Sequence, residues 1–168
     1  MSVPGAFLDR DGVLIEDCGF PHLDEHLRLV PGAAAAVKRL NDLGYRTVIV
    51  TNQSGVARGL FDEERMHAFN ALLLKRLADE GARIDAVYAC PFHAEATVAR
   101  YRHPDHPDRK PNPGMLLRAI AEHDIDPARS LMVGDQPSDM EAACRAGVQG
   151  LRFEGGDLDL FLQERLGG

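Results

Sequence analysis

Two aspartates that stand two positions apart are the first residues of this chain whose types and spacing are suited to chemistry. Asp9 and Asp11 follow the short apolar run Ala6–Leu8, and Gly12 comes next. Aspartate and glycine often follow a strand for structural reasons alone, so the pair is also typical of a turn. Past the end of a strand the chain turns, and residues two apart can then face the same group. Two carboxylates in that arrangement are suited to nucleophilic attack and to general acid–base catalysis.

Two more aspartates follow a later apolar run in the same kind of position. Asp135 comes directly after Leu131–Gly134, and Asp139 is four residues further on. Four carboxylates at one edge of a sheet would repel one another, and some would be driven to bind protons unless a cation joined them. A site built from carboxylate oxygens, with no soft ligands such as thiolates, favours Mg²⁺, which usually also binds a substrate phosphate. The four acids therefore predict a magnesium site, with capping of the following helix as the alternative role for Asp139.

Three further polar residues could supply what a bound phosphate needs besides a metal. Thr51 and Asn52 end the apolar run "RTVIVTN", and Lys110 lies in the proline-rich stretch "RKPNPG". Lysine offers a fixed positive charge, while threonine, asparagine and nearby backbone N–H groups offer hydrogen bonds. Together with the acids, these residues favour binding and transfer of a phosphoryl group.

Apolar runs of strand length alternate with helical patterns along the whole chain. This alternation predicts an α/β, doubly wound fold with a central parallel sheet, helices on both faces and right-handed crossovers. Ligands bind at the carboxyl ends of the strands in such folds, and the polar residues above stand at those ends. The expected strands are 6–9, 46–52, 86–90, 131–135 and 148–153, and the expected helices are 31–44, 62–81, 112–123, 138–147 and 157–166.

Length and composition narrow the classes of protein to which the chain could belong. Its 168 residues favour a single domain over residues 1–168, and the two long irregular segments, Ile15–Val30 and Pro91–Pro111, leave no room for a large cap domain. A net charge of −7 argues against a nucleic acid or an anionic membrane as the main partner. Three cysteines are too few for a disulfide framework, and no segment has the form of a membrane span or a signal peptide. We expect a cytoplasmic monomer that acts on a small phosphorylated metabolite.

Four motifs in order give a more specific expectation. The stretches "FLDRDGVL", "VTNQSGVARG", "RKPNPGM" and "VGDQPSDMEAA" together resemble those of the haloacid dehalogenase superfamily of phosphotransferases. Within it, they are similar to the D-glycero-D-manno-heptose 1,7-bisphosphate phosphatases and to the related histidinol-phosphate phosphatases. "TNQSGVARG", "KPNPGM" and "DCGF" favour the heptose branch.

The resemblance implies a role for each acid. Asp9 is the expected nucleophile, which forms an aspartyl-phosphate, and Asp11 is the expected general acid and then base. Mg²⁺ is expected on the Asp9 carboxylate, the Asp11 carbonyl and Asp135, with Asp139 as a further ligand or as an anchor for a bound water. Thr51 and Lys110 are expected to hold the phosphoryl oxygens. This arrangement implies hydrolysis of a phosphomonoester in two displacements.

The resemblance also implies a set of substrate-binding residues around the two long segments. One member departs from the pattern, because the heptose branch usually has a lysine after the metal-binding aspartate and this chain has Gln136. No chemical role is expected for the thiol of Cys18, although it lies in the expected substrate loop. The expected substrate-binding residues are Asp17, Cys18, Gly19, Phe20, Asn52, Gln53, Ser54, Arg58, Arg109 and Gln136.

A structural zinc site is a further feature that the resemblance raises. Both branches often hold zinc with a Cys-x-His pair and a later Cys-x-Cys pair, but here Phe92 takes the place of the first histidine and the second pair has no cysteine. An unusual site built from histidine and aspartate ligands is chemically reasonable. The sequence favours instead a loop without zinc, folded by proline and local packing, with Cys90 as a buried thiol. The residues that would form the zinc site are Cys90, His93, His103, His106 and Asp108.

The function expected from these observations is removal of the 7-phosphate from a heptose 1,7-bisphosphate. The enzyme alternative is a histidinol-phosphate phosphatase or another small sugar-phosphate phosphatase. A receiver-type phosphoacceptor module also gathers acids, a threonine and a lysine at strand ends. It carries its acceptor aspartate on a middle strand, however, and needs no proton donor two residues later. The presence of Asp11 after Asp9 therefore favours the enzyme.

Overall fold

A five-stranded parallel sheet forms the centre of the computed structural model, which describes residues 1–167. All four pairs of neighbouring strands run parallel, in the order β3-β2-β1-β4-β5. This confirms the predicted doubly wound sheet. The strands are β1 Val3–Leu8, β2 Arg46–Asn52, β3 Ala86–Cys90, β4 Ile125–Gly134 and β5 Gln149–Arg152.

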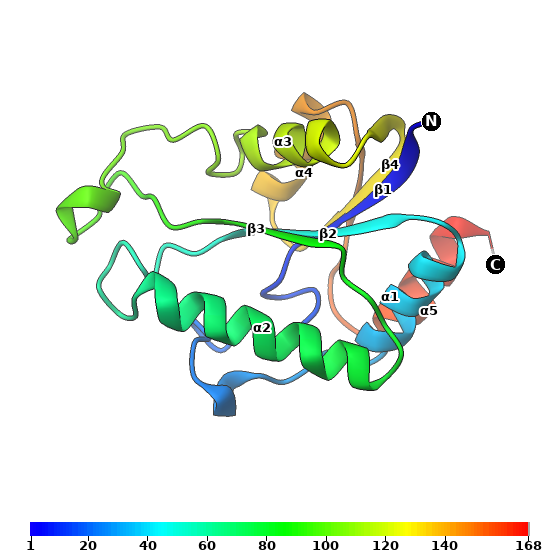
Figure 1. Cartoon of the computed structure of the whole chain (residues 1–168), viewed down its shortest axis with the longest axis horizontal. Helices are drawn as coiled ribbons and strands as arrows, with labels where there is room; N and C mark the ends of the chain where they lie inside the picture. The colour runs from blue at the N-terminus through cyan, green and yellow to red at the C-terminus, as the bar shows by residue number, and fades with distance from the viewer. Residues whose placement is uncertain (168) are drawn as a thin grey trace.

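Helices cover both faces of the sheet. Helices α1, α2 and α5 contribute to one apolar core, and α3 and α4 contribute to another on the opposite face (Figure 1). Within residues 1–167 no separate cap domain is inserted between the elements, and none of the helices is long and apolar enough to cross a membrane. The helices are α1 Ala33–Asp42, α2 Glu63–Asp79, α3 Gly114–Glu122, α4 Pro137–Arg145 and α5 Leu158–Leu166, with short 3-10 turns at Asp24–His26 and Ala99–Tyr101.

The side chains of β1 explain why both faces need a helical layer. Phe7 faces one core, whereas Ala6 and Leu8 face the other, and all three are fully buried. A strand that buries successive residues must be covered on both sides, because its side chains alternate between the faces. On one side the cover includes α2, which buries Phe69 and Leu73 as the helical spacing predicts.

The register of the sheet brings the functional strand ends together. Leu8, the last residue of β1, lies opposite Ile49 of β2 and Val133 of β4. Asp9 extends this pairing, because its N–H donates to the carbonyl of Val133 at 3.1 Å. The residues that follow β1, β2 and β4 therefore meet at one edge of the sheet.

Several boundaries differ from the sequence prediction by a few residues, and two of the differences have a clear structural cause. Strand β4 begins at Ile125 rather than at 131, because Ile125 and Asp126 already pair with the start of β1 before an irregularity in the register. Helix α3 begins at Gly114 rather than at Asn112, the first residue of the expected helix. The amide of Asn112 instead donates to the carboxylate of Asp105, so it holds the preceding loop.

Candidate active site

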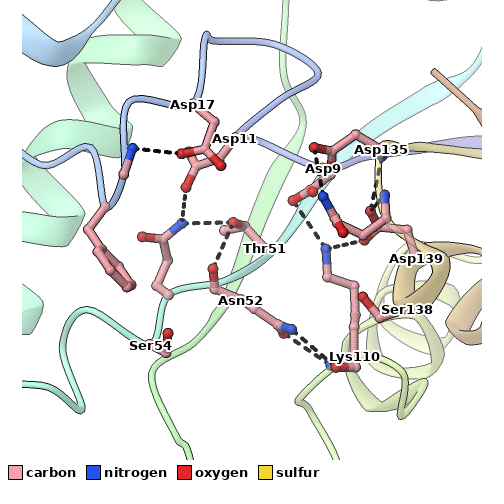
Figure 2. Close-up of a pocket in the computed structure, with 14 residues that line it drawn as sticks. Asp9, Asp11, Asp17, Thr51, Asn52, Ser54, Lys110, Asp135, Ser138 and Asp139 are labelled. Carbon is pink, nitrogen blue, oxygen red and sulfur yellow. Dashed lines mark hydrogen bonds and ion pairs between the residues drawn. The ribbon is translucent and has the colours of Figure 1, made fainter. Parts of the chain in front are cut away.

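A cavity of about 380 Å³ lies at the carboxyl edge of the sheet (Figure 2). Its volume is in the range of small-molecule sites. Segments that follow β1, β2, β3 and β4 all contribute to its wall. The lining residues are Asp9, Asp11, Asp17, Gly19, Phe20, Thr51, Asn52, Gln53, Ser54, Lys110, Asp135, Gln136, Ser138 and Asp139.

Lys110 forms the charged centre of this cavity and is almost fully buried. Its ammonium group donates to Asp139 Oδ1 at 2.6 Å and to the carbonyl of Val50 at 2.9 Å, and it lies 3.1 Å from Asp9 Oδ1. Asp9 Oδ1 also accepts from the N–H of Arg10 at 2.8 Å. These contacts fix the orientation of the Asp9 carboxylate.

Burial and neighbouring charge act on the pKa of both partners. Burial raises the pKa of Asp9 well above its usual range; Lys110 opposes that effect, and the carboxylates of Asp139, Asp11 and Asp135 add to it. Burial alone would lower the pKa of Lys110, but the carboxylates of Asp9 and Asp139 outweigh it and raise that pKa. Lys110 therefore stays charged, and further positive charge nearby would favour the ionised form of Asp9.

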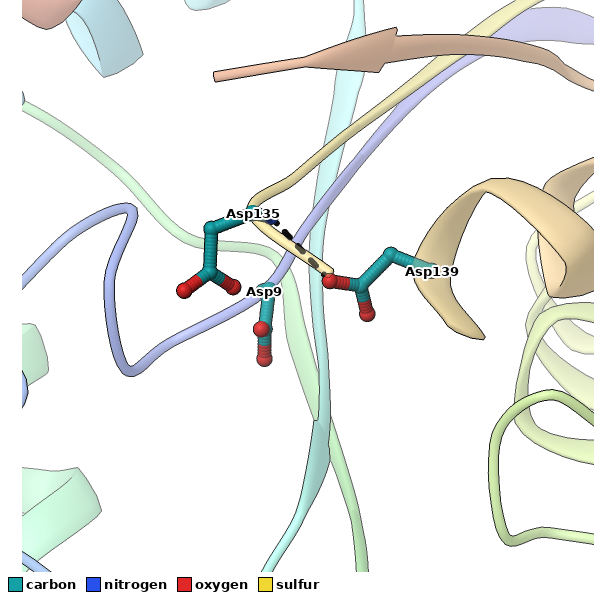
Figure 3. A group of neighbouring side chains, drawn as sticks. All are labelled: Asp9, Asp135 and Asp139. Atoms are coloured by element: carbon teal, nitrogen blue, oxygen red, sulfur yellow. Dashed lines mark hydrogen bonds between the residues drawn. The ribbon is translucent and has the colours of Figure 1, made fainter. Parts of the chain in front are cut away.

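Three carboxylates converge closely enough to hold one cation. One oxygen of each of Asp9, Asp135 and Asp139 lies within 4.8 Å of the others (Figure 3). Asp135 Oδ1 is buried and has no hydrogen-bond partner among residues 1–167, which is costly unless a ligand satisfies it. A hard divalent cation such as Mg²⁺ fits this donor set, because all the ligand atoms are carboxylate oxygens.

Asp139 is also tied to the start of α4. Its Oδ2 accepts from the N–H groups of Asp135 and Gln136, each at 3.1 Å, while Oδ1 accepts from Lys110. Asp139 therefore caps the start of α4, which is the alternative role expected from the sequence, and it also belongs to the cluster of three carboxylates.

Gly12 allows the chain after Asp11 to lie against the acidic cluster. Its φ of 86° is in the left-handed region, and a Cβ there would come 2.1 Å from Asp135 Oδ2. Any side chain at this position would displace the Asp135 carboxylate. Because Gly12 has no side chain, the backbone that follows Asp11 can lie directly beside the carboxylate of Asp135.

Asp11 and Thr51 are joined by Gln53. The amide of Gln53 donates to Thr51 Oγ1 at 2.8 Å and to Asp11 Oδ2 at 3.3 Å. Gln53 is buried, and its bond to Thr51 is buried with it. A second amide, that of Asn52, pairs with both the N–H and the carbonyl of Lys110. The two amides therefore position the side chains expected to hold a phosphate.

The sequence of the chain matches the family model of the haloacid dehalogenase-like hydrolases over residues 5–147. The chain belongs to this family. It is 48% identical over 164 residues, 97% of this chain and 90% of the relative, to the D-glycero-beta-D-manno-heptose-1,7-bisphosphate 7-phosphatase of Rhodopseudomonas palustris. The corresponding enzyme of Escherichia coli K12 is 42% identical over 88% of this chain and 76% of its own length.

The solved structures that resemble this chain include the same kind of enzyme as the relatives found by sequence. The D,D-heptose 1,7-bisphosphate phosphatase of B. bronchiseptica, complexed with magnesium and phosphate, superposes with a TM-score of 0.79 and 33% identity. The match covers 96% of this chain and 86% of that chain. This member of the haloacid dehalogenase-like family is therefore a phosphatase.

Three of the expected substrate-binding residues do not line the cavity of this phosphatase. Cys18 is exposed outside it, and Arg58 holds its guanidinium 5.5 Å from the centre of the Phe20 ring. Arg109 is half-buried, and its Nη1 is buried without a hydrogen-bond partner. Burial lowers the pKa of Arg109, and the nearby charge of Arg58 adds to that effect.

Sequence reasoning missed three residues of the phosphatase site. Ser138 lines the cavity from the first turn of α4, and only its place at a predicted helix start could have indicated it. Arg10 and Asn70 lie behind Asp11, where the guanidinium of Arg10 donates to the amide oxygen of Asn70 at 2.8 Å. Nothing in the spacing of the sequence indicates that pair, because 60 residues separate its members.

The loop that carries the zinc candidates has an arrangement of its own. The ring of Phe92 stacks on His106 with a centroid distance of 4.0 Å. Nδ1 of His93, His103 and His106 each accepts from the backbone N–H two residues later. Among the residues that the structure describes, the three aspartates above form the metal-type cluster, and the zinc candidates form none. The structure therefore gives no support to zinc in this loop.

Proposed function

We propose that this phosphatase removes the 7-phosphate from D-glycero-D-manno-heptose 1,7-bisphosphate, with Mg²⁺ and through an aspartyl-phosphate. The observation that carries the chemistry is the position of Asp9. It is a buried carboxylate held by Lys110, and it lies in a cavity that also contains Asp11, Thr51 and Asp135. The relatives at 42–48% identity, which are named as heptose bisphosphate 7-phosphatases, support the substrate.

The proposed reaction has two displacements at phosphorus. In the first, an oxygen of Asp9 forms a bond to phosphorus as the bond to the sugar oxygen breaks, and Asp11 gives its proton to that leaving oxygen. In the second, Asp11 takes a proton from water, the water oxygen bonds to phosphorus, and the bond to Asp9 breaks. Inorganic phosphate leaves and both aspartates return to their starting states.

Lys110 and Thr51 stabilise the transferring group in this proposal. The transition state carries negative charge on the phosphoryl oxygens, which a fixed ammonium group and a hydroxyl can bind. Lys110 already lies beside Asp9, and Thr51 is oriented by its bond from Gln53. Because both are buried, their interactions with the phosphoryl group are strong.

Magnesium would be held by Asp9, the carbonyl of Asp11, Asp135 and Asp139. When bound, it would neutralise charge on the nucleophile and on the phosphoryl oxygens. The buried Oδ1 of Asp135, which has no other partner, supports this site.

The second phosphate of the substrate would bind to the arginines beside the cavity. The positive charge of Arg58 acts on Arg109, and Arg109 has a buried donor that no group of the described residues accepts. Arg58 also packs against Phe20, which lines the cavity in the loop that follows Asp17. An anion that bridged the two arginines would satisfy the donor, and this favours a bisphosphate over a monophosphate.

Gln136 lines the cavity where the heptose branch usually carries a lysine. Its amide lies 3.4 Å from Asp135 Oδ2, which is long for a hydrogen bond. Gln136 can donate to a sugar hydroxyl or a phosphate oxygen, but it adds no charge. We therefore assign the attraction for the second phosphate to the arginines.

The decisive experiment is Mg²⁺-dependent phosphate release from a panel of substrates. It would compare both anomers of heptose 1,7-bisphosphate, heptose and hexose monophosphates, fructose 1,6-bisphosphate and histidinol phosphate, with Asp9→Asn as the inactive control. We expect one heptose bisphosphate to lead by about a hundredfold in kcat/KM, which is roughly 2.7 kcal/mol of transition-state discrimination. Preference for histidinol phosphate, or equal turnover of the whole panel, would overturn the heptose assignment.

A further inference from the structure

Arg10 stands between the two catalytic aspartates and is almost completely buried. Its side chain is 1% exposed, and it is among the largest fully buried side chains of the described chain. Its guanidinium also lies 4.6 Å from the centre of the Phe69 ring. A buried charge is costly unless each polar atom is satisfied, so its partners show what the arginine does.

The first of these partners is the carboxylate of Asp11. Arg10 Nε donates to Asp11 Oδ1 at 2.7 Å, and Nη2 donates to Oδ2 at 3.3 Å. A two-pronged contact between a guanidinium and a carboxylate fixes the plane of the carboxyl group as well as its position. Arg10 therefore sets the direction in which Asp11 faces the cavity.

The remaining partners of Arg10 come from three other parts of the chain. Nη2 donates to the carbonyl of Pro21 at 3.0 Å, just after the loop that lines the cavity, and to Gln53 Oε1 at 3.1 Å. Nη1 donates to Asn70 of α2 at 2.8 Å. Gln53 in turn bonds Thr51 and Asp11, so one guanidinium connects the proton donor, the phosphate-binding hydroxyl and the expected substrate loop.

We propose that Arg10 is a positioning residue that holds the Asp11 carboxyl group in place for proton transfer to the leaving oxygen. This inference rests on the proposed role of Asp11. Arg10 does not itself line the cavity, and it acts through the groups that do. General acid catalysis requires the proton donor within hydrogen-bond reach of the leaving oxygen, so a carboxyl group free to rotate would lose much of its contribution.

The test uses two substrates that differ in their need for a proton donor. A sugar phosphate expels a basic alkoxide, which must be protonated as it leaves, whereas p-nitrophenyl phosphate expels a stable phenolate. For Arg10→Lys, which keeps the charge but cannot make the two-pronged contact with Asp11, we expect kcat/KM on the sugar phosphate to fall by about a hundredfold, within the usual range for general acid catalysis. We expect kcat/KM on p-nitrophenyl phosphate to fall less than about threefold. The comparison uses kcat/KM because it reports the first displacement alone, whereas kcat also includes the attack of water, which needs Asp11 with either substrate. Equal losses on the two substrates, or no loss on either, would overturn the proposal.

Arg39→Lys is the matched control for simple destabilisation. Arg39 makes the same two-pronged contact with Asp159, Nε to Oδ1 at 2.8 Å and Nη2 to Oδ2 at 3.2 Å, but it joins α1 to α5 away from the cavity. This variant should lower the melting temperature and leave the ratio of the two kcat/KM values unchanged. A change in that ratio as large as the one for Arg10→Lys would show that the effect is only structural.

A double-mutant cycle separates this inference from the proposed function. Asp11→Asn should itself depress kcat/KM on the sugar phosphate far more than kcat/KM on p-nitrophenyl phosphate; if it does not, the proposed role of Asp11 as proton donor fails. If it does, Arg10→Lys should cause little further loss in the Asp11→Asn background, because Arg10 acts through Asp11. If the loss in the double variant equalled the product of the losses in the two single variants, the proposed role of Arg10 would be overturned while the role of Asp11 would stand.

Discussion

At the scale of single residues, the site contains more negative charge than its one buried lysine can offset. Lys110 contacts Asp9, Asp139 and the carbonyl of Val50, so its single positive charge is shared between two carboxylates of the site. Asp135 Oδ1 is also buried, but it accepts no hydrogen bond from any described residue. The protein alone leaves this carboxylate unsatisfied, and a bound cation would satisfy it.

The role of Asp135 can be tested by its effect on stability with and without magnesium. Without Mg²⁺ we expect Asp135→Asn to be at least as stable as the parent, because it removes a charge that faces Asp9 and Asp139. With Mg²⁺ at a hundred times its dissociation constant, the parent should gain about 2.7 kcal/mol in free energy of unfolding, and the variant should gain much less. Urea denaturation at both conditions measures this difference.

Asp42→Asn provides the control for that experiment. Asp42 is an exposed aspartate of α1 that pairs with Lys38 and does not line the cavity. Its variant should respond to Mg²⁺ as the parent does. An equal response from Asp135→Asn would show that Asp135 is not a ligand.

At the scale of elements, the close packing of α4 on β4 places Asp139 in the site. A Cβ at Gly134 would lie 2.2 Å from the Cβ of Asp139, so only glycine allows the helix to start this close to the end of the strand. Asp139 then bonds the N–H groups at the turn and reaches Lys110. The tight turn between strand and helix therefore also positions a charged group of the site.

At the opposite edge of the sheet, Asp85 joins the starts of β2 and β3. Its Oδ2 accepts from the N–H of Thr47 at 2.9 Å, and its Oδ1 accepts from Arg83 at 2.9 Å. Burial would raise the pKa of Asp85, but the hydrogen bonds from Thr47 and the charge of Arg83 outweigh it and lower that pKa. The folded state therefore favours the ionised carboxylate more than the unfolded state does.

This lowered pKa predicts how the contribution of Asp85 changes with pH. The stabilisation is fully present above the ordinary pKa of an unfolded aspartate and is lost as pH falls through the lower folded pKa. We expect Asp85→Asn to cost about 1–2 kcal/mol at pH 7, a typical value for lost hydrogen bonds to a charged group, and the gap to the parent to close below about pH 4. Urea denaturation between pH 7 and pH 3 measures the gap.

The exposed aspartate Asp79, which pairs with Lys75 on α2, is the control for the pH series. Asp79→Asn should differ little from the parent at any pH, because exposed ion pairs contribute little to stability. A gap for Asp85→Asn that stayed constant down to pH 3 would contradict the expected role of its ionised form.

The elements also show how far the sequence could predict the structure. Asp9, Thr51 and Asp135 could be placed at one edge because each ends an apolar run, and parallel strands align their ends. The early start of β4 could not be predicted, because Pro127 and Arg129 interrupt the apolar pattern before Leu131. The contacts of Arg10 could not be predicted either. They depend on residues up to 60 positions away, and nothing in local periodicity indicates which buried side chains will meet.

At the scale of the whole molecule, the charge of the protein opposes binding of its proposed substrate. The chain carries a net charge of −7. Among the described residues that line the cavity there are five carboxylates and one lysine, so the surface that must receive a phosphate is itself acidic. The arginines beside the cavity offset only part of this charge. An anion would therefore enter the cavity most favourably after a divalent cation has bound.

This charge balance predicts that magnesium and phosphate bind cooperatively. We expect inorganic phosphate to bind at least tenfold more tightly when Mg²⁺ is saturating, and Mg²⁺ to bind more tightly by the same factor when phosphate is saturating, because the coupling must be reciprocal. Isothermal titration calorimetry of each ligand with and without the other measures both factors at constant ionic strength. Asp42→Asn, whose carboxylate lies outside the cavity, should show the same coupling as the parent. Phosphate affinity that did not change with Mg²⁺ would mean that the arginines, rather than the cation, offset the acidic cavity, and the proposed metal site would then have no part in phosphate binding.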